Sequence, residues 1–173
     1  MGVGAALWDV RNGTLGNDIE IGAWTTGRDI GTAQADMLTR ATVALRGLLA
    51  LPASEARYFT ARTDSAGRAL SGSCSYTMSG QALSARWWSV TLYDRQGWLV
   101  SNRWNQHSAG SAGAAAAPWQ LIIAPQPQAG LWIATGNDDA FELTLRTYRP
   151  SGVLASDPAR AAMPTITRGT CAA

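Results

Sequence analysis

Between residues 32 and 52 the apolar positions follow a helical spacing, and after residue 52 they alternate as in β-strands. One apolar stripe recurs at i, i+4, i+7, i+8 and i+11: Met37, Ala41, Ala44, Leu45 and Leu48. Thr32 can cap the start of this segment. Pro52 ends it, because the residue before a proline is pushed out of the α region. The pattern predicts one amphipathic helix over about 33–50 that packs on the rest of the chain.

Residues 85–93 form an aromatic and β-branched run without a proline, and they predict a central strand. Alternation places Trp88, Val90 and Leu92 on one wholly apolar face, which should face the core. The other face carries two rings and two hydroxyls: Trp87, Ser89, Thr91 and Tyr93. This mixed face is either a second buried layer or the floor of a cleft.

Further strands are predicted at spacings of roughly ten residues. The clearest alternation spans 141–148, with one apolar face and one face that carries Glu142, Thr144, Arg146 and Tyr148. A weaker alternation over 19–24 predicts a short edge strand. The remaining runs are 57–62, 70–78, 98–102, 119–124 and 131–134.

The other segments are predicted to lack long regular structure. Asp64-Ser65-Ala66-Gly67 reads as a turn, because aspartate and glycine occupy favoured turn positions. The Ala-, Gly- and Ser-rich stretch 109–117 predicts a loop. The tail 150–173 is expected to be extended and held at its end. Together the pattern favours a mainly β, jelly-roll-like sandwich with one N-terminal helix, in a single domain over 9–173.

The composition argues against a nucleic-acid-binding protein. All fourteen basic residues are arginine, but they are scattered along the chain and the net charge is only +2. A nucleic-acid partner would require a basic patch or stripe. The arginine usage is better explained by codon bias in a GC-rich genome.

Two cysteines, Cys74 and Cys171, bear on the cellular compartment. Neither belongs to a metal-ligand spacing, so no metal site and no cofactor are predicted. A disulfide between them would require an oxidising compartment and would contribute about 4–5 kcal/mol in the chain-entropy model. The alternative is two free, buried thiols in a cytosolic protein.

Residues 1–8 are small and apolar, end in a tryptophan and precede a polar segment. They are typical of the end of a membrane-spanning segment with an interfacial tryptophan. The sequence therefore predicts a protein of the periplasm or cell envelope, anchored in the inner membrane at its N-terminus. The alternative is that residues 1–8 are a soluble N-terminal segment without a role in membrane anchoring.

His107 is the only histidine and the candidate catalytic residue, since a single imidazole can act as a general base. Ser108 and Asn105 are close to it in sequence, but no Gly-x-Ser-x-Gly motif is present. The alternative is a histidine in a surface loop without catalytic function.

Eight tryptophans in 173 residues favour a surface that stacks on sugars or other planar ligands. The residues predicted to line such a surface are Trp87, Tyr93, Trp104, His107, Arg146 and Tyr148. The alternative is that these rings pack in the core, which is expected most strongly for Trp88 and Trp132.

Several motifs in order resemble the bacterial domain of unknown function 1214 family. They include Tyr58-Phe59-Thr60-Ala61, Trp87-Trp88-Ser89-Val90-Thr91-Leu92-Tyr93 and Leu143-Thr144-Leu145-Arg146-Thr147-Tyr148. The resemblance implies a jelly-roll-like sandwich, and small members resemble membrane-anchored envelope proteins. It implies no reaction. The chain departs from the family pattern at 112–118 and at 131–134, both near the predicted cleft.

These observations favour a non-catalytic binding or structural module with an aromatic-lined face, whose ligand is a small molecule or a glycan. One alternative is an envelope hydrolase or carbohydrate-active enzyme that uses His107. Another is a subunit that docks a protein partner through an exposed sheet face.

Overall fold

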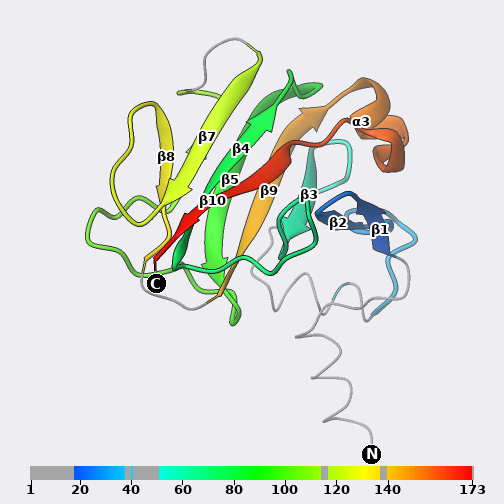
Figure 1. Ribbon diagram of the computed structural model, residues 1–173. Coiled ribbons are helices and arrows are strands. Elements are labelled where there is room, and N and C mark those ends of the chain that lie inside the picture. Colours follow the sequence, from blue (N-terminus) through cyan, green and yellow to red (C-terminus); the bar gives the residue numbers. More distant parts are fainter. Residues whose placement is uncertain (1–17, 38–39, 41–50, 114–116, 137–139, 173) are drawn as a thin grey trace, which may run out of the picture.

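Two β-sheets stack face to face in the computed structural model, which describes residues 18–37, 40, 51–113, 117–136 and 140–172. In Figure 1 the sheet that contains β10, β4 and β7 lies in front of β9 and β5. Apolar side chains from both sheets form one buried cluster, so the molecule is a β-sandwich. The mainly β class predicted from the alternation is confirmed.

The larger sheet has six antiparallel strands. In pairing order they are β1 (Asp18–Ile21), β2 (Trp24–Gly27), β3 (Ala56–Ala61), β9 (Phe141–Pro150), β5 (Ala85–Asp94) and β6 (Ser108–Gly110). The two longest strands, β5 and β9, pair along their whole length at the centre of this sheet. β6 forms one edge, where it pairs with residues 89–91 of β5.

The smaller sheet has four strands. In pairing order they are β10 (Thr165–Cys171), β4 (Cys74–Gly80), β7 (Trp119–Ala124) and β8 (Leu131–Ala134). β7 and β8 run parallel, while the other pairs are antiparallel. The edge strand β8 lies near β6 of the larger sheet, so two sheet edges meet on one side of the sandwich.

The inward faces of the strands agree with the predicted alternation. Trp88, Val90 and Leu92 are buried in the core, as the pattern of residues 85–93 predicts. Trp88 stacks on Trp119 of the facing sheet with ring centroids 4.3 Å apart. Tyr76 meets Phe141 edge to face across the same interface at 5.7 Å. Such aromatic contacts add to the area that the core buries.

The predicted amphipathic helix over about 33–50 is not supported. The α-helix that the described residues contain in full is the short α3 (Gly152–Ser156), which is followed by a 3-10 turn, η1 (Pro158–Arg160). Residues 33–34 form a turn, and Met37, the first residue of the apolar stripe, is 87% exposed. A helix that packed through this stripe would bury Met37. Residues 38–39 and 41–50 lie outside the described residues, as do residues 1–8, for which a membrane segment is predicted.

Other segment predictions are wrong in detail. Residues 98–102 form no strand: the carboxylate of Asp94 accepts the backbone N–H groups of Gln96 and Trp98 and holds this segment in a turn. β6 lies partly within the predicted loop 109–117. The end of the tail is extended and held in place, as predicted, because β10 pairs with β4 and Cys171 forms the disulfide. Residues 19–24 span parts of two paired strands, β1 and β2.

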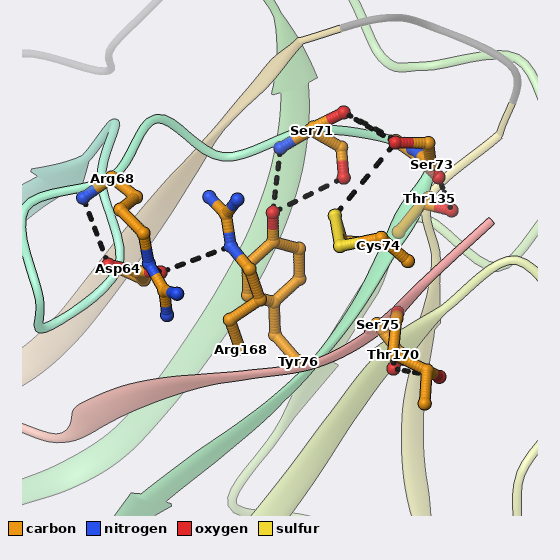
Figure 2. Close-up of a disulfide and its surroundings, with 12 residues drawn as sticks. Asp64, Arg68, Ser71, Ser73, Cys74, Ser75, Tyr76, Thr135, Arg168 and Thr170 are labelled. Atoms are coloured by element: carbon orange, nitrogen blue, oxygen red, sulfur yellow. Dashed lines mark hydrogen bonds and ion pairs between the residues drawn. A yellow bond between two sulfur atoms is a disulfide. The ribbon is translucent and has the colours of Figure 1, made fainter. Parts of the chain in front are cut away.

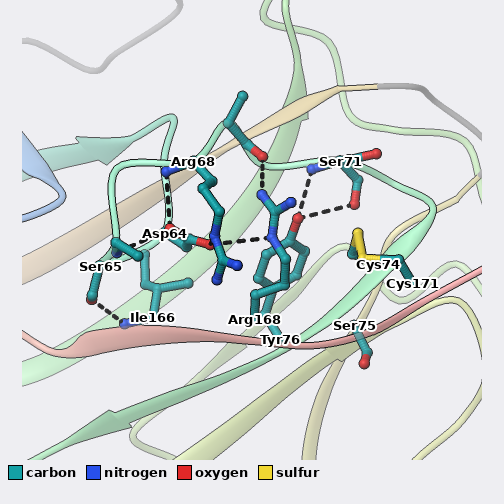
Figure 3. A network of polar contacts seen from close by, with 12 residues as sticks. Asp64, Ser65, Arg68, Ser71, Cys74, Ser75, Tyr76, Ile166, Arg168 and Cys171 are labelled. Carbon is teal, nitrogen blue, oxygen red and sulfur yellow. Dashed lines mark hydrogen bonds and ion pairs between the residues drawn. A yellow bond between two sulfur atoms is a disulfide. The ribbon is translucent and has the colours of Figure 1, made fainter.

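Cys74 and Cys171 form the predicted disulfide, between directly opposed residues of β4 and β10. Figure 2 shows the surroundings of Cys74, and Figure 3 labels both cysteines. The bond joins positions 97 residues apart. Disulfides persist in oxidising compartments, so this bond indicates an extracytoplasmic environment. Among the residues that the structure describes, no helix is both long and apolar enough to span a lipid bilayer.

A buried carboxylate ties the predicted turn at residues 64–67 to β10 (Figure 3). Asp64 is 1% exposed, and its Oδ2 lies 2.9 Å from Arg68 Nε and 3.1 Å from Arg168 Nε. Its Oδ1 accepts the backbone N–H groups of Ala66 and Arg68. Burial alone would raise the pKa of Asp64, but these hydrogen bonds and the charge of Arg68 together hold the pKa below its ordinary value.

Candidate functional site

The outer face of the larger sheet gathers the aromatic and charged side chains that point away from the core. We call Tyr58, Trp87, Tyr93, Arg146 and Tyr148 the aromatic face. Strand register sets their places: Tyr148 lies opposite Trp87, and Arg146 lies between Tyr58 and Ser89. Side chains opposed in this way are about 5 Å apart at Cβ, so they contact one another. Four of the six predicted ligand-binding residues thus meet on one surface.

Trp87 and Tyr148 form the most exposed part of the aromatic face. Their ring centroids are 5.0 Å apart and their planes are tilted by 45°. Trp87 is 40% exposed, although Ser89 and Thr91 on the same face of its strand are buried. A large ring left in contact with water on a sheet provides a planar, apolar surface for a ligand.

Arg146 is held by neutral groups. Its Nη1 donates to Thr91 Oγ1 at 3.1 Å and its Nη2 donates to the Tyr93 hydroxyl at 2.7 Å. The guanidinium carbon lies 5.4 Å from the centroid of the Tyr93 ring. Within the described part of the chain no carboxylate forms an ion pair with Arg146, because the nearby Glu142 pairs with Arg62 at 3.0 Å. The aromatic face therefore carries a positive charge.

Tyr58 does not neutralise that charge. Burial raises the pKa of the Tyr58 phenol above its ordinary value, and repulsion from an ionised Tyr148 would raise it further. The positive charge of Arg146 acts in the opposite direction but is the weaker influence. Tyr58 therefore stays protonated at neutral pH and can act as a hydrogen-bonding hydroxyl.

A groove opens beside the aromatic face, where β6 and β8 approach each other. We call it the Trp groove, because Trp87 of β5 and Trp132 of β8 both line it. Its volume is about 440 Å³, and its other lining residues include Ser89, Gln106, Ser108 and Leu131. A second hollow of about 470 Å³ shares Leu131 and extends to Trp119. The Trp groove has the size and mixed lining of a small-molecule site.

Gln106 holds the two edges of the Trp groove together. Its Nε2 donates to the carbonyl oxygen of Ser108 at 2.8 Å and to that of Trp132 at 3.0 Å. The backbone carbonyl oxygen of Gln106 accepts the backbone N–H of Ala134. One side chain thus fixes β6 against β8, which the sequence pattern alone does not indicate.

His107 lies in the loop before β6, with both ring nitrogens engaged by amides. Asn102 Oδ1 accepts two backbone N–H groups, so its Nδ2 donates to His107 Nδ1 at 3.1 Å. His107 Nε2 therefore carries the proton and donates to Asn105 Oδ1 at 2.9 Å. In the described residues no hydrogen bond joins this imidazole to a carboxylate or a hydroxyl. The two amides thus fix the orientation of the imidazole within its loop.

Trp104 is separated from the aromatic face. Its ring meets Trp132 edge to face at 5.4 Å, and the guanidinium of Arg103 lies 4.2 Å above it. Trp104 thus supports Trp132, which lines the Trp groove. Trp132, expected in the core, is only partly buried. Its position at the groove depends on the approach of two sheet edges, which periodicity does not reveal.

No group of three or more histidine, cysteine, aspartate or glutamate side chains in the described residues is arranged to hold a metal ion.

Comparison with known proteins identifies a family and a fold. Residues 55–152, more than half of the chain, match the family described as "Protein of unknown function (DUF1214)". No curated protein matches. The crystal structure of VPA0106 from Vibrio parahaemolyticus is similar, with a TM-score of 0.64 and 24% identity over 77% of this chain. An uncharacterised protein from Burkholderia cenocepacia has a TM-score of 0.53 and 15% identity over 98% of this chain.

Both similar structures belong to longer proteins. The chain spans 35% of the Vibrio protein and 41% of the Burkholderia protein. At these identities the likeness establishes a shared fold and does not indicate a shared ligand.

Proposed function

We propose that this chain, which belongs to the DUF1214 family of proteins of unknown function, is a non-catalytic binding module for a small molecule or glycan. The aromatic face and the Trp groove form the binding site. The observation that carries this proposal is Trp87, which is 40% exposed and lines a groove of about 440 Å³.

The physical argument concerns the surface that Trp87 leaves in water. Covering the exposed part of this ring with a planar ligand would remove apolar area from solvent at about 25 cal/mol per Å². Trp132 on the opposite side of the groove offers a second ring. The hydroxyl of Ser108 and the amide of Gln106 can orient a polar group between the rings.

We place this activity in the periplasm or cell envelope. The Cys74–Cys171 disulfide supports that compartment. An enzyme that uses His107 is less well supported, because the imidazole is held between Asn102 and Asn105.

A protein-docking role is the second candidate, and a separate surface favours it. Trp98 and Leu99, in the turn after β5, are 73% and 50% exposed. Adjacent exposed apolar side chains of this size are typical of protein-binding surfaces.

The binding proposal predicts a ligand-dependent rise in stability. The oxidised protein would be heated with a panel of oligosaccharides, peptidoglycan fragments, lipids and aromatic acids. A ligand at a hundred times its dissociation constant adds about 2.7 kcal/mol, which is measurable as a raised melting temperature. The Trp87→Ala variant should lose this rise.

Trp98→Ala is the matched control, since it removes an exposed tryptophan outside the groove. If a ligand stabilises both variants as it does the wild type, the site is elsewhere. If no class of ligand gives a shift, the docking role becomes the better reading, and Trp98 is the residue to test against partner proteins.

A further inference from the structure

We infer that Arg146 anchors an oxyanion, a carboxylate or phosphate group on a ligand whose planar body lies against Trp87 in the Trp groove. This inference rests on the proposed function and specifies its ligand class. The site combines one guanidinium, the hydroxyls that hold it and the neighbouring groove.

The first step concerns charge. The other arginines with described contacts on nearby strands meet acceptors within the chain: Arg62 pairs with Glu142, Arg57 donates to a backbone carbonyl, and Arg168 lies beside Asp64. Among the described residues, the guanidinium of Arg146 donates hydrogen bonds to two hydroxyls, those of Thr91 and Tyr93. A structural role for Arg146 would be served by a carboxylate or a carbonyl, and the described residues supply neither.

The second step concerns the unused donors. A guanidinium has five N–H groups, and two of those of Arg146 are engaged. Thr91 and Tyr93 accept those two hydrogen bonds, so their own hydroxyl protons remain available to donate. The cluster is therefore a set of converging donors around a positive charge, which is the arrangement that binds oxyanions.

The third step places this cluster beside the groove. Ser89 lines the groove and lies directly opposite Arg146 in the β5–β9 register. Thr91, which holds Nη1, lies opposite Ser108 of β6, another lining residue. Ser89 and Ser108 therefore connect the Trp groove to the strand positions beside which the guanidinium is held.

Neighbouring groups preserve the positive charge. Glu142 is the acid on the same face of β9, and Arg62 already pairs with it. Tyr58, opposite Arg146 on β3, is a protonated phenol at neutral pH. The carboxylate of Glu142 is therefore already paired with a cation of this chain.

The test compares probes that share one body and differ in the head group. The wild-type protein would be titrated calorimetrically at low salt with 2-naphthoate, 2-naphthyl phosphate and the neutral 2-naphthamide. We expect at least one anion to bind roughly 10- to 100-fold more tightly than the amide, as for a hydrogen bond to a charged group. The two anions distinguish a carboxylate ligand from a phosphate ligand.

Arg146→Gln should remove the preference for the anion, so that 2-naphthoate and 2-naphthyl phosphate bind no more tightly to this variant than 2-naphthamide does. Arg86→Gln, the same change at an exposed position on the opposite face of β5, should keep the preference. Arg146→Lys keeps the charge without the planar fork and should retain part of it. If Arg146→Gln does not fold, the affinities of the wild type and of Arg146→Lys for the three probes still test whether the anion is preferred.

Equal binding of the amide and both anions by the wild type would overturn the anion site, as would a preference that survives in Arg146→Gln. In either case the proposed function stands if Trp87→Ala weakens all three probes. If none of the probes binds, both the anion site and its groove are overturned for planar ligands.

Discussion

Asp64 is the residue whose environment departs most from that of a surface carboxylate. It receives two backbone N–H groups and two arginines while being almost fully buried. Asp64→Asn would leave Arg168 near a neutral side chain at the join between the 64–67 turn and β10. We expect a loss of about 3 kcal/mol in the free energy of unfolding, measured by urea denaturation at pH 7.

Glu55→Gln provides the comparison for Asp64→Asn. Glu55 lies 3.7 Å from Arg149 in an exposed ion pair. Exposed pairs contribute little, so this variant should stay within about 0.5 kcal/mol of the wild type. Equal losses in the free energy of unfolding of the two variants would show that burial does not determine how much the Asp64 contacts stabilise the fold.

The lowered pKa of Asp64 also predicts a pH dependence. A carboxyl group whose pKa is lower in the folded state stabilises the fold above its unfolded pKa. That stabilisation is lost as the pH falls through the folded value, which lies below the ordinary 3.8. Urea denaturation between pH 7 and pH 2 should show a steeper fall in stability below about pH 4 for the wild type than for Asp64→Asn.

Residue patterns predicted part of the candidate site. Period-two alternation placed Trp87, Tyr93, Arg146 and Tyr148 on outward faces, and pairing of β5 with β9 brought them together. The same alternation in β3 would have added Tyr58. Gln106 and Trp132 could not be found this way, since their roles depend on two sheet edges that are distant in sequence.

At the scale of elements, the side chain of Gln106 is a specific link between β6 and β8. Gln106→Leu would leave the carbonyls of Ser108 and Trp132 without their shared donor, at a cost of about 1–3 kcal/mol. Hydrogen exchange followed by mass spectrometry should show faster exchange in β6 and β8. The β3–β9 pair should be unaffected, and uniform acceleration across all strands would contradict a local role.

The strand errors share one physical cause. β6 has three residues, Ser-Ala-Gly, with little strand propensity, and it is a strand because β5 offers it an edge. A Cβ at Gly110 would lie 2.4 Å from the Trp88 carbonyl oxygen, so the small residue permits this pairing. Conversely, residues 98–102 have suitable side chains, but the Asp94 carboxylate holds their start in a turn. In both segments a specific contact, with the edge of β5 or with the Asp94 carboxylate, outweighs the strand propensity of the residues.

For the whole molecule, the disulfide is the main covalent constraint. Reduction of the Cys74–Cys171 bond, or the Cys74→Ser/Cys171→Ser double variant, should lower the free energy of unfolding by about 2–5 kcal/mol. Denaturation with and without a reductant measures this. The stability of the double variant should not change with the reductant. If the stability of the wild type does not change either, the Cys74–Cys171 bond does not stabilise the fold as predicted.

The pairing of β10 with β4 also constrains the order in which a newly made chain can reach its native state. β4 begins at Cys74, but its partner strand ends at Cys171, 97 residues later. During synthesis or secretion, one edge of β4 stays open until nearly a hundred further residues have emerged. An open strand edge is prone to pair with other chains. A chain crossing a membrane should therefore depend on chaperones or thiol oxidases most strongly just before its last strand appears.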